Sequence, residues 1–254
     1  MTTARRARVR PKLAETKILE RRELTPDHWL MWIEKPEGFT FKPGQYCTIG
    51  SEGIERAYSI ASAPHEDRIE LFVELVPYEE GGHLTPLLYA LKAGDKVTIR
   101  PRAKGIFTFN PNFKNHVLVA TVTGVVPYIS YIRDYLHKGL QDGENGHRFF
   151  VLEGASYDDE FGYDDELERY AAEHPELVTF IATVSRPDEE RNSGWKGEKG
   201  RVNAIVETQV EKLGLGKDDT LIYACGHPGM IEDVKARMTP KGYSVDEERF
   251  WKEE

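Results

Sequence analysis

The chain changes its hydrophobic pattern near residues 110–112, and this change limits its fold more than any other feature. Beyond it, apolar runs of strand length alternate with longer amphipathic stretches of helix length. That alternation indicates parallel strands joined by helical crossovers, in one sheet covered by helices. We expect strands at 116–121, 148–153, 178–185 and 220–225, and helices at 127–138, 163–173, 202–212 and 228–238.

The residues before this point show short β-rich runs separated by turn residues. Runs of this kind are typical of a small antiparallel barrel or sandwich. We therefore expect two domains: an antiparallel β-barrel over 1–111 and an α/β domain with a parallel sheet over 112–254. The barrel strands are expected at 16–23, 28–34, 45–49, 57–60, 68–76 and 96–100, with a short helix at 83–90.

The composition excludes several classes of protein. A formal net charge of −9 argues against a general nucleic-acid binder, which needs a basic excess. The two cysteines, Cys47 and Cys225, are too few for an iron–sulfur cluster and show no metal-ligand spacing. They favour a reducing compartment over a disulfide framework. No apolar run is long enough to span a membrane, and we expect a cytoplasmic monomer without a metal site.

The run Arg56-Ala57-Tyr58-Ser59 is the first candidate site. Alternate residues of an extended segment share a face, so Arg56 and Tyr58 lie together, with Ser59 opposite unless the strand ends there. A guanidinium suits a phosphate and an aromatic ring suits a flat ligand. The run therefore favours a dinucleotide that carries a ring system. An edge strand with a surface arginine and a half-buried tyrosine is the alternative.

This run resembles the R-x-Y-S flavin signature of the ferredoxin–NADP reductase superfamily, including its bacterial, FAD-containing members. The resemblance implies that Arg56 contacts the FAD pyrophosphate and that Tyr58 packs against the isoalloxazine. It also implies that Ser59 reaches the reactive edge of the flavin. The cofactor-binding residues expected beside them are Ala57, Glu74 and Val76.

A second segment, Gly82-His83-Leu84-Thr85, supports a phosphate site. A glycine before a helix presents free backbone N–H groups, and Thr85 is a good helix N-cap. It resembles the family's G-x-x-S/T segment, which implies that these four residues bind the FAD pyrophosphate. A capped helix without a ligand is the alternative.

Two turns in the second half resemble the family's pyridine-nucleotide motifs. Thr123, Gly124 and Pro127 match a G-T-G-x-x-P turn that holds the pyrophosphate and the nicotinamide. Val122 stands where the family usually has glycine, which reduces the room for close backbone approach. Tight structural turns are the alternative. The family's C-G-x-P-x-M motif is matched by Cys225, Gly226, Pro228 and Met230.

The resemblance implies that Ser59 and Cys225 are the catalytic residues, where the nicotinamide meets the flavin. Cys225 would act by position and electrostatics, without forming a covalent bond. A structural cysteine, buried in the core, is the alternative for Cys225 alone.

Ser185 and Arg186 decide the expected nucleotide. A hydroxyl and an arginine after a strand hold an adenosine 2′-phosphate, whereas an acidic residue would favour NAD. They resemble the S/T-R pair of NADP-specific members, and Arg201 resembles a second basic contact. Solvated loop arginines are the alternative. By resemblance to bacterial relatives, Phe250 or Trp251 in the aromatic C-terminal tail stacks on the FAD; packing on the barrel is the alternative.

The expected function follows from the resemblance. NADPH would deliver a hydride to FAD, and electrons would leave singly to a ferredoxin or a flavodoxin. Two alternatives stay open: a reductase subunit of an oxygenase or other multi-component enzyme, and a nucleotide-binding regulator that has lost turnover. Two basic clusters are candidates for steering an acidic carrier: Arg5, Arg6, Arg8, Arg10 and Lys12, or Arg100, Arg102 and Lys104.

Overall fold

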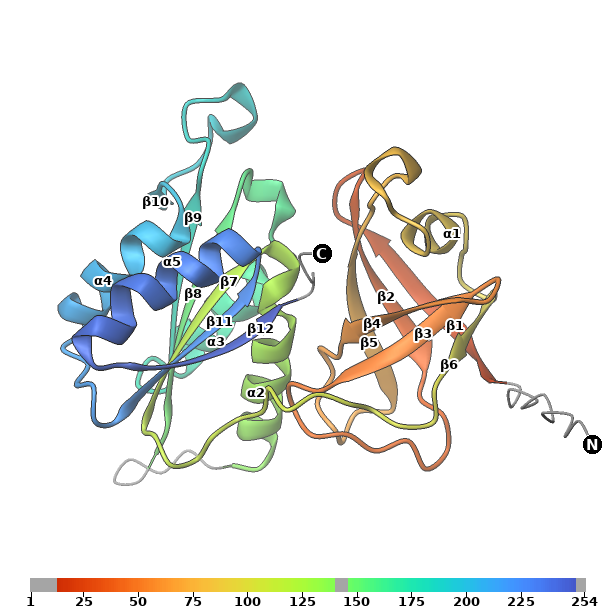
Figure 1. Cartoon of the computed structure of the whole chain (residues 1–254), viewed down its shortest axis with the longest axis horizontal. Helices are drawn as coiled ribbons and strands as arrows, with labels where there is room; N and C mark the ends of the chain where they lie inside the picture. Colours follow the sequence, from red (N-terminus) through yellow and green to blue (C-terminus); the bar gives the residue numbers. More distant parts are fainter. Residues whose placement is uncertain (1–12, 140–145, 250–254) are drawn as a thin grey trace, which may run out of the picture.

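The structure, a computed structural model, describes residues 13–139 and 146–249. The first unit is a six-stranded antiparallel sheet curled into a barrel (Figure 1). Its strand order is β4-β3-β6-β1-β2-β5. The strands are β1 (Ala14–Glu23), β2 (His28–Glu34), β3 (Tyr46–Ser51), β4 (Ile54–Ser59), β5 (Arg68–Glu74) and β6 (Lys96–Ile99).

The second unit is a six-stranded sheet of order β10-β9-β8-β7-β11-β12, and all its strand pairs are parallel. Both halves of the predicted fold class are therefore confirmed. The predicted boundary at residue 111 lies between β6 and β7 and stays a prediction. The strands are β7 (Asn115–Thr121), β8 (Arg148–Ala155), β9 (Val178–Val184), β10 (Glu198–Lys199), β11 (Thr220–Gly226) and β12 (Ser244–Arg249).

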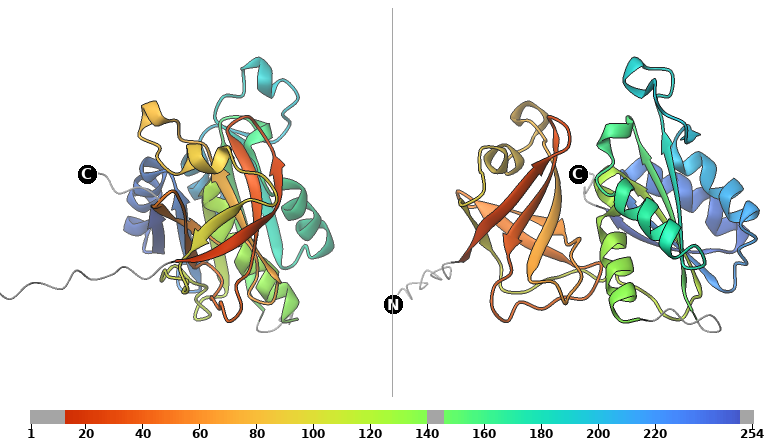
Figure 2. Two further views of the ribbon diagram at one scale, coloured as in Figure 1. Left: turned by 90° about the vertical axis from the view of Figure 1, so that its right-hand side faces the viewer. Right: turned by 180° about the vertical axis from the view of Figure 1, so that it is seen from behind.

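Helices cover both faces of the parallel sheet (Figures 1 and 2). Side chains alternate along each strand. Leu118 and Val151 therefore pack toward α2 and α3, while Val119 and Leu152 pack toward α4 and α5. The helices are α1 (Thr85–Tyr89), α2 (Val126–His137), α3 (Asp164–Glu173), α4 (Val202–Lys212) and α5 (Pro228–Met238). Short 3-10 turns are η1 (Tyr78–Glu80), η2 (Val122–Val125), η3 (Asp158–Glu160), η4 (Glu190–Asn192) and η5 (Thr239–Lys241).

Helix α2 lies between the parallel sheet and the barrel, and it joins the two units into one core. Nine of its 12 residues are buried, as expected for a helix that is covered on all sides. The Ser130 hydroxyl donates to the Ser62 carbonyl at 2.7 Å, and the Tyr131 hydroxyl donates to the Phe107 carbonyl at 2.9 Å. These bonds attach the helix to the barrel and to the segment that follows β6.

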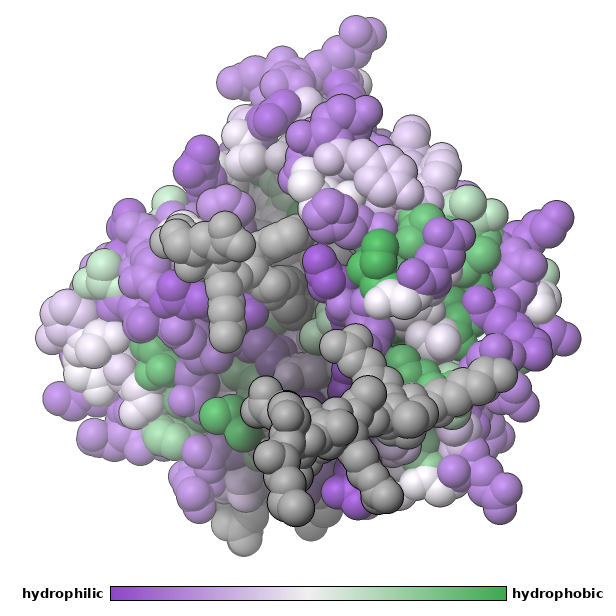
Figure 3. All heavy atoms as spheres, turned by 45° about the vertical axis from the view of Figure 1, so that its right-hand side comes forward, coloured by the Kyte–Doolittle hydropathy of each residue, from purple (hydrophilic) through white to green (hydrophobic). Residues whose placement is uncertain are grey.

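The face drawn in Figure 3 is mostly hydrophilic, and hydrophobic residues come to the surface there chiefly on the barrel side. Within 13–139 and 146–249, no helix has the length and the apolar content needed to span a bilayer.

Two strands were not predicted. β10 has only two residues, and β12 carries the charged run Asp246-Glu247-Glu248-Arg249. β12 forms because backbone hydrogen bonds pair it with the buried strand β11, although its side chains have little apolar character. β12 is at the edge of the sheet and is paired on one side only. Its side chains can therefore be polar, because an edge strand is less enclosed than a central one.

Candidate functional site

Two cavities meet in the cleft between the barrel and the α/β unit, and Glu74 and Thr123 line both of them. The first, the barrel cavity, lies among the ends of β4 and β5, the segment before α1 and the start of α2. Its lining residues are Arg56, Ala57, Tyr58, Ser59, Phe72, Glu74, Val76, Gly81, Gly82, His83, Leu84, Thr85, Thr123 and Val126.

Residues 56–59 all line the barrel cavity. β4 ends at Ser59. The alternation of faces along the strand therefore stops there, and Ser59 lines the same cavity as Arg56 and Tyr58. Arg56 is exposed and donates a hydrogen bond to the Glu55 carbonyl at 2.9 Å, whereas Ser59 is only 8% exposed. Burial raises the pKa of Tyr58 above its usual value, so its hydroxyl stays protonated. The run offers a free cationic end and a buried hydroxyl end.

The segment before α1 contributes its backbone to the cavity. The expectation that Thr85 is the N-cap is wrong, because Leu84 occupies that position and Thr85 is the first helical residue. The Thr85 hydroxyl instead accepts from the Val76 N–H at 2.9 Å and donates to the Val76 carbonyl at 3.0 Å. It thereby holds the segment on the end of β5. In the described part of the chain, the N–H groups of His83 and Leu84 have no protein acceptor.

The second cavity, the sheet-edge cavity, lies where β7, β8, β9 and β11 end. The carboxyl ends of parallel strands meet at one edge, where α/β folds bind ligands. Its lining residues are His28, Glu74, Thr121, Val122, Thr123, Gly154, Ala155, Ser156, Glu160, Ser185, Arg201, Val202, Asn203, Gly226, His227, Gly229 and Met230.

The turns after β7 and β11 interlock through two glycines. A Cβ on Gly124 would meet the Cys225 carbonyl oxygen at 2.2 Å, and a Cβ on Gly226 would meet Thr121 Oγ1 at 2.2 Å. The His227 N–H donates to that Thr121 oxygen at 2.8 Å. The two turns therefore form one continuous floor, and neither glycine can be replaced without moving the other turn.

Val122 lies in this floor with a φ of 43°. Such a backbone conformation costs a β-branched residue about 1–3 kcal/mol. The Val122 side chain packs against the main core and against the cluster of Ala155, Phe161 and Val184. The backbone thus adopts a conformation suited to glycine, and side-chain packing offsets the strain.

Cys225 is fully buried and lines neither cavity. Burial, with a contribution from Glu248, raises the pKa of its thiol well above the usual value, so the thiol stays protonated. Glu248 lies opposite Cys225 in the register of β12 with β11, and its carboxylate accepts from the Ser59 hydroxyl at 3.5 Å. Burial raises the pKa of Glu248 to about 7, although the bond to Ser59 works in the opposite direction. A carboxyl that changes protonation near neutral pH therefore adjoins Ser59.

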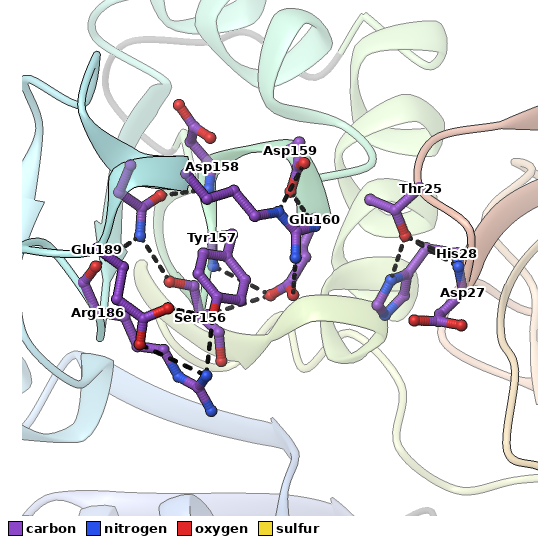
Figure 4. Close-up of polar contacts among 12 residues, drawn as sticks. Thr25, Asp27, His28, Ser156, Tyr157, Asp158, Asp159, Glu160, Arg186 and Glu189 are labelled. Carbon is purple, nitrogen blue, oxygen red and sulfur yellow. Dashed lines mark hydrogen bonds and ion pairs between the residues drawn. The ribbon is translucent and has the colours of Figure 1, made fainter.

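The barrel contributes titratable side chains to the cleft from β2 and β5, where His28 is opposite Glu74. Thr25 Oγ1 fixes the His28 ring, at 3.0 Å from its Nδ1. Glu160, in η3, lies across the cleft from them (Figure 4). Burial raises the pKa of Glu74, the neighbouring His28 lowers it, and Glu160 raises it again. The net pKa is raised, so Glu74 holds its proton more readily than a solvated carboxyl does.

Ser185 follows β9 directly and Arg201 precedes α4, and both line the sheet-edge cavity. Arg186 lines neither cavity. Its Nη1 donates to the Tyr157 hydroxyl at 2.8 Å and lies 3.7 Å from Glu189 Oε1 (Figure 4). Two of the three predicted phosphate ligands, Ser185 and Arg201, therefore line the cavity. The third, Arg186, is already paired with Tyr157 and Glu189.

Most predicted site residues line one of the two cavities, Met230 among them. Pro127 and Pro228 stand in the first turns of α2 and α5 and shape the turns before them. The residues that line neither cavity are Gly124, Pro127, Arg186, Cys225 and Pro228. Phe250 and Trp251 lie outside the described residues, as do Arg5, Arg6, Arg8, Arg10 and Lys12. Arg100 forms a bidentate pair with Glu55 at 2.8 and 2.9 Å.

Sequence reasoning missed several residues at the cleft. The sequence could have indicated three of them, Gly154, Ala155 and Ser156, because they stand at the end of a predicted strand. That strand, β8, ends at the same edge of the sheet as β7. Glu248 had no such signal, since its strand is highly charged and separated from Ser59 by 189 positions.

Comparisons with known proteins agree with this architecture. A family model described as "Oxidoreductase NAD-binding domain" matches residues 118–236. Ferredoxin–NADP reductase B of Sorangium cellulosum is 32% identical over 233 residues, which cover 87% of this chain and 89% of that protein. The flavodoxin/ferredoxin–NADP reductase of Escherichia coli is 28% identical over 205 residues, 77% of each chain.

Among solved structures, a ferredoxin NADP+ reductase from Neisseria gonorrhoeae with bound FAD and NADP has a TM-score of 0.81. It shares 22% sequence identity and covers 95% of this chain and 100% of its own, which shows a common fold. Barrel, parallel sheet and shared cleft thus define a two-unit oxidoreductase. The chain belongs to the ferredoxin–NADP reductase family.

Proposed function

We propose that this protein uses FAD and NADP(H) to transfer electrons between the nicotinamide nucleotide and a one-electron carrier, a ferredoxin or a flavodoxin. Membership of the family supports the oxidoreductase activity and both cofactors. The single observation that carries the proposal is the pair of cavities that meet at Glu74 and Thr123. Two ligands bound there would contact each other at the shared boundary.

The barrel cavity fits FAD by the chemistry of its donors. Arg56 at the exposed end supplies a guanidinium for phosphate, and the N–H groups of His83 and Leu84 are available for a second contact. Tyr58 supplies an aromatic face and Ser59 a hydroxyl at the inner end. FAD, when bound, accepts a hydride from NADPH and releases electrons singly.

The sheet-edge cavity fits the nicotinamide nucleotide. Its floor is the interlocked pair of turns after β7 and β11, where Thr123 and Gly226 lie. Ser185 and Arg201 lie at the far side, and we assign them, with Arg186, to the adenosine 2′-phosphate.

Ser59 lines the barrel cavity, and its partner Glu248, with Cys225, would act from behind it. The thiol of Cys225 is buried and protonated and lines neither cavity, so it would act only by its position behind the floor. Glu248 holds a proton near neutral pH and accepts from the Ser59 hydroxyl. Ser59 therefore has a partner that changes charge in the range where the enzyme would work.

The decisive test starts with the absorption spectrum of the purified protein and with binding of FAD to the apoprotein. Tyr58→Ala should weaken FAD binding, because it removes the aromatic wall of the barrel cavity. Tyr78→Ala is the matched control, since Tyr78 is 59% exposed and lines neither cavity. A wild-type protein without flavin affinity would overturn the proposal and favour a regulator that has lost turnover.

The acceptor is tested separately. Reduction of the holoprotein by NADPH, followed by rapid mixing with a ferredoxin, a flavodoxin and a dye, should show transfer to one or both protein carriers. Fast reduction of the dye with no transfer to either carrier would favour the reductase subunit of a multi-component enzyme.

A further inference from the structure

Arg186 is held by two groups of its own domain. Its Nη1 donates to the Tyr157 hydroxyl at 2.8 Å and lies 3.7 Å from Glu189 Oε1. The Tyr157 hydroxyl donates in turn to the other Glu189 carboxylate oxygen. Figure 4 shows the three side chains gathered on one side of the 156–160 turn. We call this triad of Arg186, Tyr157 and Glu189 the arginine clasp.

The position of Tyr157 in the clasp is supported from several directions. The Arg191 Cζ lies 4.1 Å from the centre of its ring, within range of a cation–π contact. Arg191 itself is bound to Asp159, with Nε to Oδ2 at 2.9 Å. The Tyr157 N–H also donates to Glu160 at 3.2 Å. Tyr157 is therefore a fixed element, and Glu189 closes the clasp from the loop after β9.

Acidic residues outnumber basic residues in the two segments that form the clasp. The turn after β8 and the loop after β9 carry the carboxylates of Asp158, Asp159, Glu160, Asp188, Glu189 and Glu190. Of these, Glu189 is the one that contacts Arg186 directly. A carboxylate near the adenosine ribose is also the arrangement that favours a nucleotide without the phosphate.

We propose that Glu189 competes with the adenosine 2′-phosphate for Arg186, and so reduces the preference for NADP over NAD that Arg186 would otherwise provide. This inference rests on the proposed function, in which Ser185, Arg186 and Arg201 hold the adenosine end. A phosphate dianion can draw Arg186 away because the pair with Glu189 is half exposed, with side-chain exposures of 53% and 52%. The competition therefore changes affinity by a modest factor and does not block the site.

Binding of 2′-phospho-AMP and AMP to the holoprotein tests this, because the two probes differ only in the phosphate. Isothermal titration calorimetry gives both dissociation constants without turnover. Glu189→Gln should tighten 2′-phospho-AMP by roughly two- to fivefold and leave AMP unchanged. Glu190→Gln is the matched control: it removes the same charge one residue away, where no contact with Arg186 is made.

Coupling provides the second measurement. In an Arg186→Met background, Glu189→Gln should give no more tightening than Glu190→Gln, because the competed group is gone. This would separate competition at Arg186 from a general effect of charge.

Three outcomes would overturn the inference. Equal effects of Glu189→Gln and Glu190→Gln, with both probes bound by wild type, would refute the competition and leave the proposed function intact. Weaker binding of 2′-phospho-AMP by Glu189→Gln would show that Glu189 positions Arg186 for the phosphate. Failure of the wild-type protein to bind either probe would refute the proposed function and this inference together.

Discussion

Arg133 is predicted to be the main electrostatic link between the barrel and the α/β unit. From α2, its Nη1 lies 2.7 Å from Glu70 on β5, and its Nε and Nη2 each lie 2.7 Å from Glu166 on α3. Glu66 is a further partner at 3.7 Å. The side chain of Glu70 is only 4% exposed, so water cannot replace the guanidinium there.

Arg133→Met keeps the length of the side chain and removes its charge. Removing one partner of a buried ion pair costs about 3–5 kcal/mol, mostly because the other charge stays buried. We expect the lower end, about 3 kcal/mol, because Glu166 keeps its bond from the Tyr170 hydroxyl at 2.7 Å. Urea unfolding of the FAD-loaded protein measures the loss. Arg169→Met is the control, since its pair with Glu173 is more than half exposed and should contribute at most about 1 kcal/mol.

The dependence on pH gives a second check. Burial opposes ionisation of Glu166, but its hydrogen bond and attraction to Arg133 outweigh burial and hold its pKa below the usual value. A lowered pKa contributes stability above the unfolded value and loses it as the pH falls through the folded one. The difference between wild type and Arg133→Met should therefore narrow under acidic conditions, below about pH 4. A Met variant within 1 kcal/mol of wild type at neutral pH would refute the reasoning.

Three further predictions concern single residues. Val122→Gly should be about 1 kcal/mol more stable than Val122→Ala in urea unfolding, because only glycine relieves the φ of 43°; an equal or more stable alanine variant would contradict the strain. Glu248→Gln should remove an inflection near pH 7 from the rate of flavin reduction by NADPH, because the pKa of Glu248 is raised to about 7; an unchanged profile would exclude Glu248 as its source. Glu153 is fully buried with no hydrogen-bond partner among the described residues, and burial, then Asp164, raises its pKa. A raised pKa means that stability is lost as the pH rises above the unfolded value, so Glu153→Gln should become more stable relative to wild type in thermal melting as the pH rises above about 4; parallel curves would rule this out.

Periodicity predicted the sheets well and the polar contacts poorly. Runs such as 116–121 and 220–225 became β7 and β11 because buried parallel strands must be apolar on both faces. β12 carries almost no apolar signal, and its pairing with β11 depends on backbone groups that every residue shares. Thr85 shows the same limit on a smaller scale. Its hydroxyl could cap the helix or bond another segment. Because Val76 lies nearby, the hydroxyl bonds the Val76 backbone, which the local sequence did not indicate.

The site residues divide in the same way. Ser59, Thr123 and Gly226 were recognisable because each lies at a strand end or in a turn whose local chemistry suits a ligand, and Arg56 because it shares a strand with Tyr58 and Ser59. That chemistry is contained in a few neighbouring residues, so the sequence by itself determined it. The partners of these residues come from distant segments.

Tertiary structure alone decided that Glu248 adjoins Ser59 and that Tyr157 holds Arg186. The physical reason is that burial and charge at a site depend on which elements pack together. The pKa of Glu248 is raised because the residue is buried where β12 lies beside Ser59 of the barrel, and no local pattern records that burial.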